Sequence, residues 1–247
     1  MKMTLNQLNS LARPALIKNF LPPRRQNTDR ALLHQCLELV LVTVIALSLV
    51  SIAYRGLFGS GAWLVVPGIL AAAALLPTAL GKYKLTEIGL NFKQTGRSLR
   101  LVGITCLVAL PATYIGLYLL QRVDLTAPLI PKVPSDQWLN WLLYQIMYVA
   151  GAEELFFRGY LQSSLLRLAP TTNAKYSRIW PLTTVIISAA AFALAHVILT
   201  NNALSILIFF PGVVLGWLFL RTRSLLAPIL FHALANIGYA LMTAGLS

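Results

Sequence analysis

Seven apolar runs, each close to the length of a membrane-spanning helix, constrain the fold of this chain more than any other feature. A helix needs about 20 consecutive, predominantly apolar residues to cross a bilayer. The sequence therefore predicts an all-α, polytopic transmembrane helix bundle with seven spans, or eight if a re-entrant segment is added. The predicted spans are 35–54, 61–80, 99–120, 137–160, 180–199, 203–220 and 225–245.

Composition supports a membrane setting for the whole chain. Hydrophobic residues make up 57% of the 247 residues and charged residues only 11%, whereas a soluble domain carries about 25% charged residues. The net charge of +13 does not indicate a nucleic-acid partner, because the basic residues fall mostly between the apolar runs. There they are expected to set the topology and to contact lipid headgroups. The oligomeric state stays open.

The distribution of lysine and arginine predicts the orientation of the bundle. With the N-terminus in the cytoplasm, only Arg55, Arg122 and Lys132 fall in outer segments, which is the bias that cytoplasmic loops show. The chain then begins with a basic cytoplasmic segment at 1–34 and continues with N-terminal transmembrane helices at 35–136. Within these, residues 81–98 form an amphipathic segment expected at the membrane interface. The pattern is typical of a bacterial inner membrane.

Two adjacent acids interrupt the fourth apolar run, where a charge costs on the order of 3 kcal/mol. Glu154 and Arg158 are four residues apart, so they share a helix face and can form an ion pair. Glu153 lies about 100° further round the helix and points elsewhere. We therefore predict that Glu154 is structural and that Glu153 is available for chemistry. The alternative is a charge-paired helix end near the membrane surface.

Two later spans carry histidines that could complete a site. Phe192 and His196 are four residues apart, as are His232 and Asn236. Such histidines could simply join helices by hydrogen bonds. Together with Glu153 they could instead deprotonate a water molecule and stabilise an oxyanion. Glu153, His196 and His232 also match the ligand set of a catalytic zinc site.

These three motifs, in this order, resemble those of the CPBP (Abi, or CAAX protease and bacteriocin-processing) intramembrane proteases. The resemblance covers 137–247, which it implies is the catalytic transmembrane domain, and it implies an endopeptidase that cleaves a membrane-bound, in some members prenylated, protein or peptide. Glu153 and His196 would activate water, and His232 with Asn236 would stabilise the oxyanion. Glu154, Arg158 and Phe192 would support the site.

The sequence leaves three questions open. The resemblance fits a metalloprotease with Zn²⁺ held by Glu153, His196 and His232, and it fits equally a metal-free water activated by glutamate and histidine. The same residues could form the relay of a proton- or ion-coupled transporter, or belong to a non-catalytic bacteriocin-immunity or binding protein. A shared site requires Glu153 and His196 to lie no more than about 10 Å apart, because a larger separation is beyond what one bridging water could span.

Overall fold

The structure, a computed structural model, describes residues 29–57, 62–80, 83–91, 94–123, 137–169 and 174–246. These residues form helices joined by turns, with no strand among them, so the predicted all-α class is confirmed. The predicted basic segment 1–34 lies mostly outside the described residues. The elements are α3 (Asp29–Ile52), η1 (Ala53–Leu57), α4 (Ala62–Ala79), α5 (Thr95–Arg122), α6 (Trp138–Leu143), η3 (Tyr144–Ala150), α7 (Gly151–Glu154), η4 (Leu155–Gln162), α8 (Ser163–Arg167), α9 (Ala174–Thr200), η5 (Ala203–Ile208), α10 (Phe209–Thr222) and α11 (Leu226–Leu246).

Long apolar helices make this an integral multi-pass membrane protein. Five stretches are long and apolar enough to cross a membrane, and Leu64–Ala79 is a shorter apolar helix. The outward faces are apolar as well: Leu107 and Val108 on α5 are 79% and 70% exposed, as expected for side chains in contact with lipid. The five stretches are Arg30–Arg55, Thr95–Arg122, Tyr176–Thr200, Ala203–Thr222 and Leu226–Ala244.

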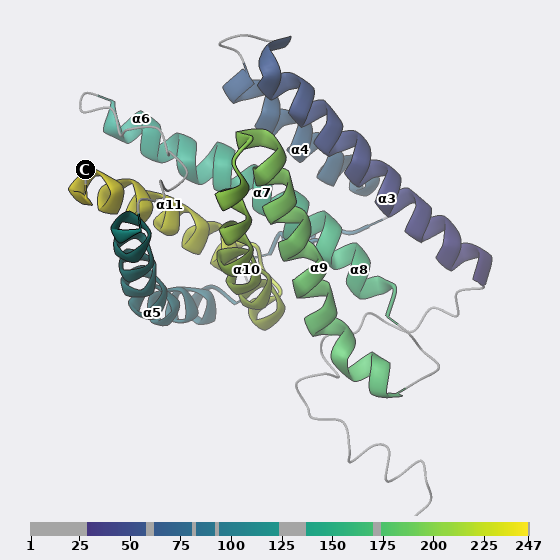
Figure 1. The fold of residues 1–247 in the computed structure, drawn as a ribbon. Coiled ribbons are helices and arrows are strands. Elements are labelled where there is room, and N and C mark those ends of the chain that lie inside the picture. Colours follow the sequence, from purple (N-terminus) through teal and green to yellow (C-terminus); the bar gives the residue numbers. More distant parts are fainter. Residues whose placement is uncertain are drawn as a thin grey trace, which may run out of the picture.

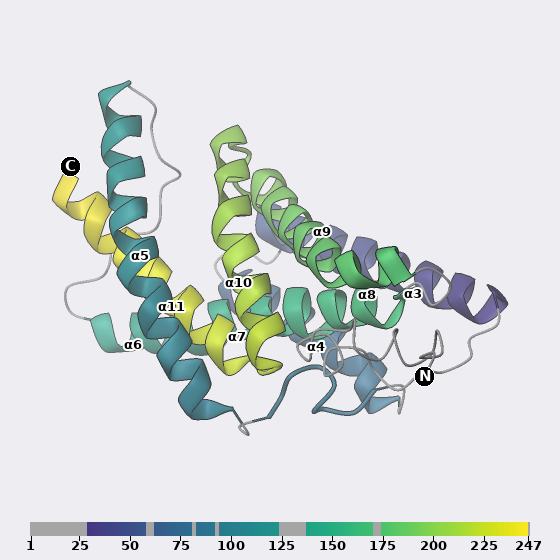
Figure 2. The same cartoon turned by 90° about the horizontal axis from the view of Figure 1, so that it is seen from below.

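The fourth predicted span is the centre of the bundle. The elements α6, η3, α7, η4 and α8 follow one another without a break from Trp138 to Arg167, and we call this run the central helix. It passes between α3 and α4 on one side and α5 and α11 on the other (Figures 1 and 2). It packs against α4, α9, α10 and α11. Its second half, from Phe156 to Leu166, is buried at every position.

The central helix is interrupted by two π-helical segments, η3 and η4, which flank the four residues of α7. A π turn closes i→i+5 hydrogen bonds and often occurs at functional sites. It also shifts the faces of the helix relative to the regular 3.6-residue period. The two glutamates therefore lie in a short α-helical turn between two shifts of register.

The predicted interfacial segment takes a different form from an amphipathic helix. Residues 83–91 form turns, and α5 begins at Thr95, within the predicted range. These turns pack on the connection between α10 and α11. Leu225 N donates to Gly89 O at 2.9 Å, the Asn91 side chain donates to Arg223 O at 2.8 Å, and Ser224 Oγ donates to Asn91 O at 2.7 Å. This part of the chain therefore binds the helices of the C-terminal half.

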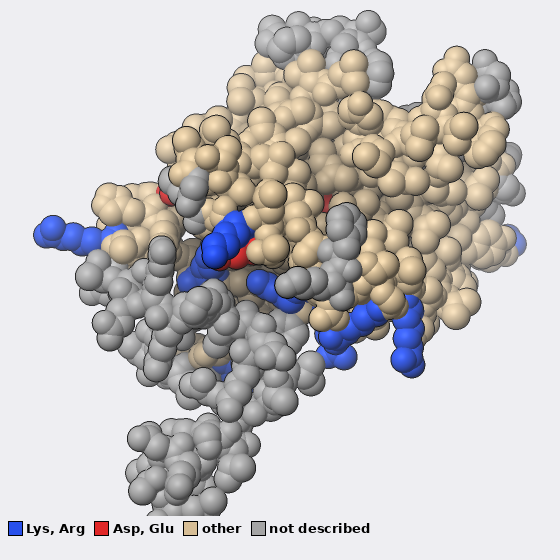
Figure 3. Space-filling view, turned by 180° about the vertical axis from the view of Figure 1, so that it is seen from behind, with Lys and Arg blue, Asp and Glu red and all other residues tan. Residues whose placement is uncertain are grey.

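Basic side chains concentrate on one part of the surface. Viewed from behind, Lys and Arg gather across the middle and lower part of the molecule, and the upper part is mostly tan (Figure 3). This asymmetry agrees with the predicted bias of basic residues towards one side of the membrane.

Candidate active site

Glu154 lies at the centre of a buried network. Its side chain is 0% exposed, and its Oε1 accepts from Arg158 Nη1 at 2.8 Å, so the predicted ion pair is confirmed. The same oxygen accepts from His232 Nδ1 at 2.8 Å. Arg158 also donates to Gly212 O at 3.0 Å and lies over the Phe192 ring at 4.5 Å. Glu154 and Arg158 together thus connect the central helix to α9, α10 and α11, which is more than the pair predicted from sequence.

Glu153 faces the two histidines that the sequence singles out. Its Oε2 lies 3.9 Å from His196 Nε2 and 3.8 Å from His232 Nε2. These distances are well within the 10 Å limit, so the predicted proximity of Glu153 and His196 is confirmed. Glu153 Oε2 is buried and has no hydrogen-bond partner. The carboxylate is therefore directed into the site by its position and is not held by a local ion pair.

Both imidazoles are fixed through their Nδ1 atoms. His196 Nδ1 lies 2.9 Å from Phe192 O, and a carbonyl oxygen can only accept, so this Nδ1 carries the proton. His232 Nδ1 lies 2.8 Å from Glu154 Oε1 and donates to it, because that carboxylate also accepts from Arg158. The Phe192 ring packs edge-on against both imidazoles, with centroids 4.5 and 5.7 Å away. Both Nε2 atoms are therefore directed towards Glu153.

Asn236 is held by a residue that the sequence did not point to. Its Nδ2 donates to Gln145 Oε1 at 3.0 Å, and Gln145 is buried. Gln145 lies in η3, eight positions before Glu153, so a regular helical period places the two about 80° apart around the helix. The only available signal was a polar side chain within an apolar run. Asn236 retains a second N–H that this bond does not use.

The helices that carry Glu153 and His196 are longer than the sequence predicts. The fourth predicted span ends at 160, but the central helix continues to Arg167. The fifth predicted span begins at 180, but α9 begins at Ala174 and continues through Pro181.

The donor types at the site suit zinc, but their spacing does not. In a tetrahedral zinc site with bonds of about 2.0–2.2 Å, two ligand atoms lie about 3.4 Å apart. The Glu153 oxygen is 3.9 and 3.8 Å from the two histidine nitrogens. Among the residues that the structure describes, no group of three His, Cys, Asp or Glu is arranged to hold a metal ion. Zinc binding stays a prediction, and no step below passes through a metal.

Comparison with known families connects this geometry to a class of proteins. Residues 135–238 match the model of a family described as type II CAAX prenyl endopeptidase Rce1-like. This part of the chain is similar to the Rce1-like family. This is the CPBP family that the three motifs resemble, so the resemblance is confirmed. The Rce1-like region includes all four predicted catalytic residues and Gln145. No curated protein and no solved structure shows a significant match to the chain.

Proposed function

We propose that the protein is an intramembrane endopeptidase that hydrolyses a peptide bond of a membrane-associated protein or peptide. The observation that carries the proposal is the position of Glu153 Oε2, less than 4 Å from the Nε2 atoms of both His196 and His232. A carboxylate that faces two imidazoles at distances too long for direct hydrogen bonds is suited to bind a water and remove its proton. The Rce1-like match supports a peptidase, and the family description supports a prenylated substrate.

In the proposed reaction Glu153 acts as the general base. A water bound between Glu153 and His196 loses a proton to the carboxylate as its oxygen attacks the scissile carbonyl carbon. A tetrahedral intermediate forms with negative charge on the former carbonyl oxygen. When this intermediate collapses, the peptide C–N bond breaks and the proton held by Glu153 passes to the leaving amine. Glu153 is then ready for another water.

The oxyanion is proposed to be stabilised by His232 and Asn236. Neutral His196 and His232 would both accept at Nε2, as Glu153 does, but a water has only two protons to donate. One of the three groups must therefore carry a proton when a single water contacts them all. His232 lies between two carboxylates, 3.8 Å from Glu153 and 2.8 Å from Glu154, so it is the best place for that proton. Protonated at Nε2, His232 is a charged donor to the oxyanion, and Asn236 adds its free N–H.

The test is cleavage by the full chain reconstituted in liposomes, with prenylated and non-prenylated fluorogenic peptides and a transmembrane peptide as substrates. Glu153→Gln and His196→Gln keep side-chain size and should lower kcat by about 10²–10⁴-fold, the usual contribution of a general acid or base. Glu87→Gln is the matched control, since Glu87 is exposed and lies outside the site. Normal cleavage by Glu153→Gln would refute the mechanism.

Further arms of the same experiment separate the alternatives. The metal-free mechanism predicts full activity after dialysis against a zinc chelator, whereas loss of activity that zinc restores would support the zinc alternative. Proton or ion flux without cleavage would support a transporter, and neither activity would support a non-catalytic immunity or binding protein. We also propose that the protein acts in a bacterial inner membrane, on the basis of its basic-residue pattern.

A further inference from the structure

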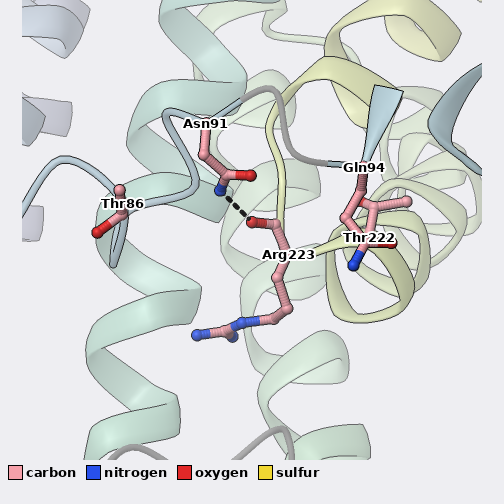
Figure 4. A pocket seen from close by; sticks show the side chains of 5 residues that line it. All are labelled: Thr86, Asn91, Gln94, Thr222 and Arg223. Carbon is pink, nitrogen blue, oxygen red and sulfur yellow. Dashed lines mark hydrogen bonds between the residues drawn. The ribbon is translucent and has the colours of Figure 1, made fainter. Parts of the chain in front are cut away.

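A polar pocket lies where three membrane helices end, away from the proposed catalytic residues. It has a volume of about 220 Å³ and is lined by Thr86, Asn91, Gln94, Thr222 and Arg223. Arg223 lies between Thr86 and Asn91 on one side and Gln94 and Thr222 on the other (Figure 4). α10 ends at Thr222, α11 begins at Leu226 and α5 begins at Thr95. Because these helices cross the membrane, their ends place the pocket at the level of the lipid headgroups.

Arg223 brings a positive charge to this pocket, and no acid among the residues that the structure describes forms an ion pair with it. Its Nη1 is buried and has no hydrogen-bond partner, and none of the five lining residues is acidic. Burial, together with the positive charge of Arg167, lowers the pKa of Arg223. Both guanidinium groups lie over aromatic rings, Arg167 over Tyr83 at 3.7 Å and Arg223 over Phe219 at 5.5 Å, but Arg167 also donates to Ser164 Oγ at 2.8 Å. An anion near Arg223 would therefore be stabilised by a charge that the protein leaves uncompensated.

The position of Arg223 is set by the backbone around it. It ends α10 in the left-handed conformation, with φ of 51°, and its carbonyl accepts from the Asn91 side chain at 2.8 Å. A non-glycine residue in this conformation is costly and persists only where surrounding contacts hold it. The guanidinium is therefore presented from a fixed turn, which lowers the entropy lost on binding a ligand.

The other lining groups can complete an anion site. Asn91 Nδ2 uses one N–H for Arg223 O and retains a second, and Thr86 and Gln94 add an exposed hydroxyl and amide. The hydroxyl of Thr222 donates to Leu218 O at 2.9 Å within its own helix, so Thr222 lines the pocket but does not donate to a ligand. The N-terminus of α5 also lies at this pocket, and the Gln94 side chain does not cap it. The positive end of the helix dipole therefore faces the pocket.

We propose that this pocket binds a phosphate group at the membrane surface. A guanidinium and several neutral donors that line one pocket suit the many acceptor positions of a tetrahedral phosphate better than those of a planar carboxylate. Phosphate is available there from two sources, anionic lipid headgroups and free phosphate in the adjoining solution. Basic pockets between transmembrane helices are known to take headgroups. The proposal does not depend on the proposed protease activity.

The experiment measures the unfolding temperature of the full chain in dodecyl maltoside, because a ligand that binds the folded state raises it. The probes are dioctanoyl phosphatidylglycerol against dioctanoylglycerol, and sodium phosphate against sodium chloride at equal ionic strength. A rise with the phospholipid alone identifies a headgroup site, and a rise with both phosphate probes identifies a site for any phosphate. No rise with either would overturn the proposal.

Variants assign the effect to the pocket. Arg223→Gln should raise the half-saturating phosphate concentration about tenfold or more, the cost of a lost charged hydrogen bond. Thr86→Val, at an exposed position where folding is not at risk, should raise it severalfold. Arg97→Gln is the control, because Arg97 is exposed on the first turn of α5 but does not line the pocket. A wild-type response from both Arg223→Gln and Thr86→Val would overturn the proposal.

Discussion

At the scale of single residues, the two adjacent glutamates have separate environments that follow from one turn of helix. Glu154 is fully buried and bound by Arg158 and His232, whereas Glu153 is 19% exposed and faces two imidazole nitrogens at distances too long for direct hydrogen bonds. An ionised Glu154 holds the Nδ1 proton of His232 and so leaves its Nε2 directed at the site. Glu154 therefore orients His232, and the proposed chemistry of Glu153 depends on that histidine.

The bond between Gln145 and Asn236 leads to the first prediction. Gln145→Leu removes the acceptor for Asn236 Nδ2 and should lower kcat by about 10- to 100-fold, less than the roughly 10²–10³-fold cost of deleting an oxyanion-hole donor. KM should stay unchanged, because the contact matters only when the oxyanion forms. Steady-state kinetics in liposomes provide the measurement, and Gln121→Leu, exposed on α5, serves as control.

A double variant distinguishes orientation from general disruption. Asn236→Ala should lower kcat strongly in the wild type but only slightly in the Gln145→Leu background, because residues of one hydrogen-bonded pair are not additive. If the fold-losses in kcat of the two single variants simply multiplied in the double variant, Gln145 would not act through Asn236.

The buried pair of Arg158 and Glu154 gives the second prediction. Both side chains are 0% exposed, so Arg158→Met would leave the buried Glu154 carboxylate without its arginine, with only His232 as partner, and should destabilise the protein by about 3–5 kcal/mol. Adding Glu154→Gln to Arg158→Met removes that negative charge and should restore more than half of the lost free energy of unfolding. Thermal unfolding in detergent measures both variants. A double variant as unstable as Arg158→Met would show that lost packing, and not the unpaired charge, is responsible.

At the scale of elements, the turn segment 83–91 connects the N-terminal half to α10 and α11. Gly89 is its critical residue, since its φ is +85° and an added Cβ would lie 2.6 Å from Phe219 Cε2 and 3.3 Å from Leu225 N. The close approach allows the Gly89 carbonyl to accept from Leu225 N. Only glycine takes this conformation without strain.

Gly89→Ala should therefore destabilise the protein by about 2 kcal/mol or more, through both the left-handed backbone and the overpacking. Gly103→Ala on α5 is the matched control, because a Cβ there meets nothing within 4 Å, and it should leave the unfolding temperature unchanged or raise it slightly. Equal unfolding temperatures for the two variants would contradict the assigned role of this turn.

The elements also show what the sequence could and could not predict. Long apolar runs fix helices because each run must satisfy its own backbone in lipid, and the seven predicted spans all fall on helices of the structure. The i, i+4 pairs of Glu154 with Arg158 and Phe192 with His196 followed from helical period alone. Gln145 was missed because π turns shift the helix faces, and the contact of His232 with Glu154 depends on helix packing that no local pattern records.

At the scale of the whole molecule, the structure constrains which parts lie on the same side of the membrane. The turns at 83–91 bond to the connection between α10 and α11 through Asn91 and Gly89, so both must face one side. With the N-terminus in the cytoplasm, as predicted, that side is cytoplasmic only if the chain returns across the membrane between Arg55 and Tyr83, although Leu64–Ala79 is shorter than the five long stretches. The bias of the basic residues predicts the same side for the turns.

The last prediction tests this topology by cysteine labelling. Cys36 and Cys106 are replaced by serine, and one new cysteine is introduced, either Thr86→Cys in the turns or Tyr54→Cys in η1, both at exposed positions. A membrane-impermeant maleimide added to intact spheroplasts should label Tyr54→Cys but not Thr86→Cys, and inverted vesicles should give the opposite result. If both cysteines reacted from the same side, α4 would not span the membrane. If both reacted from the outside, the predicted cytoplasmic side of the α10–α11 connection, and with it that of the proposed phosphate pocket, would also be wrong.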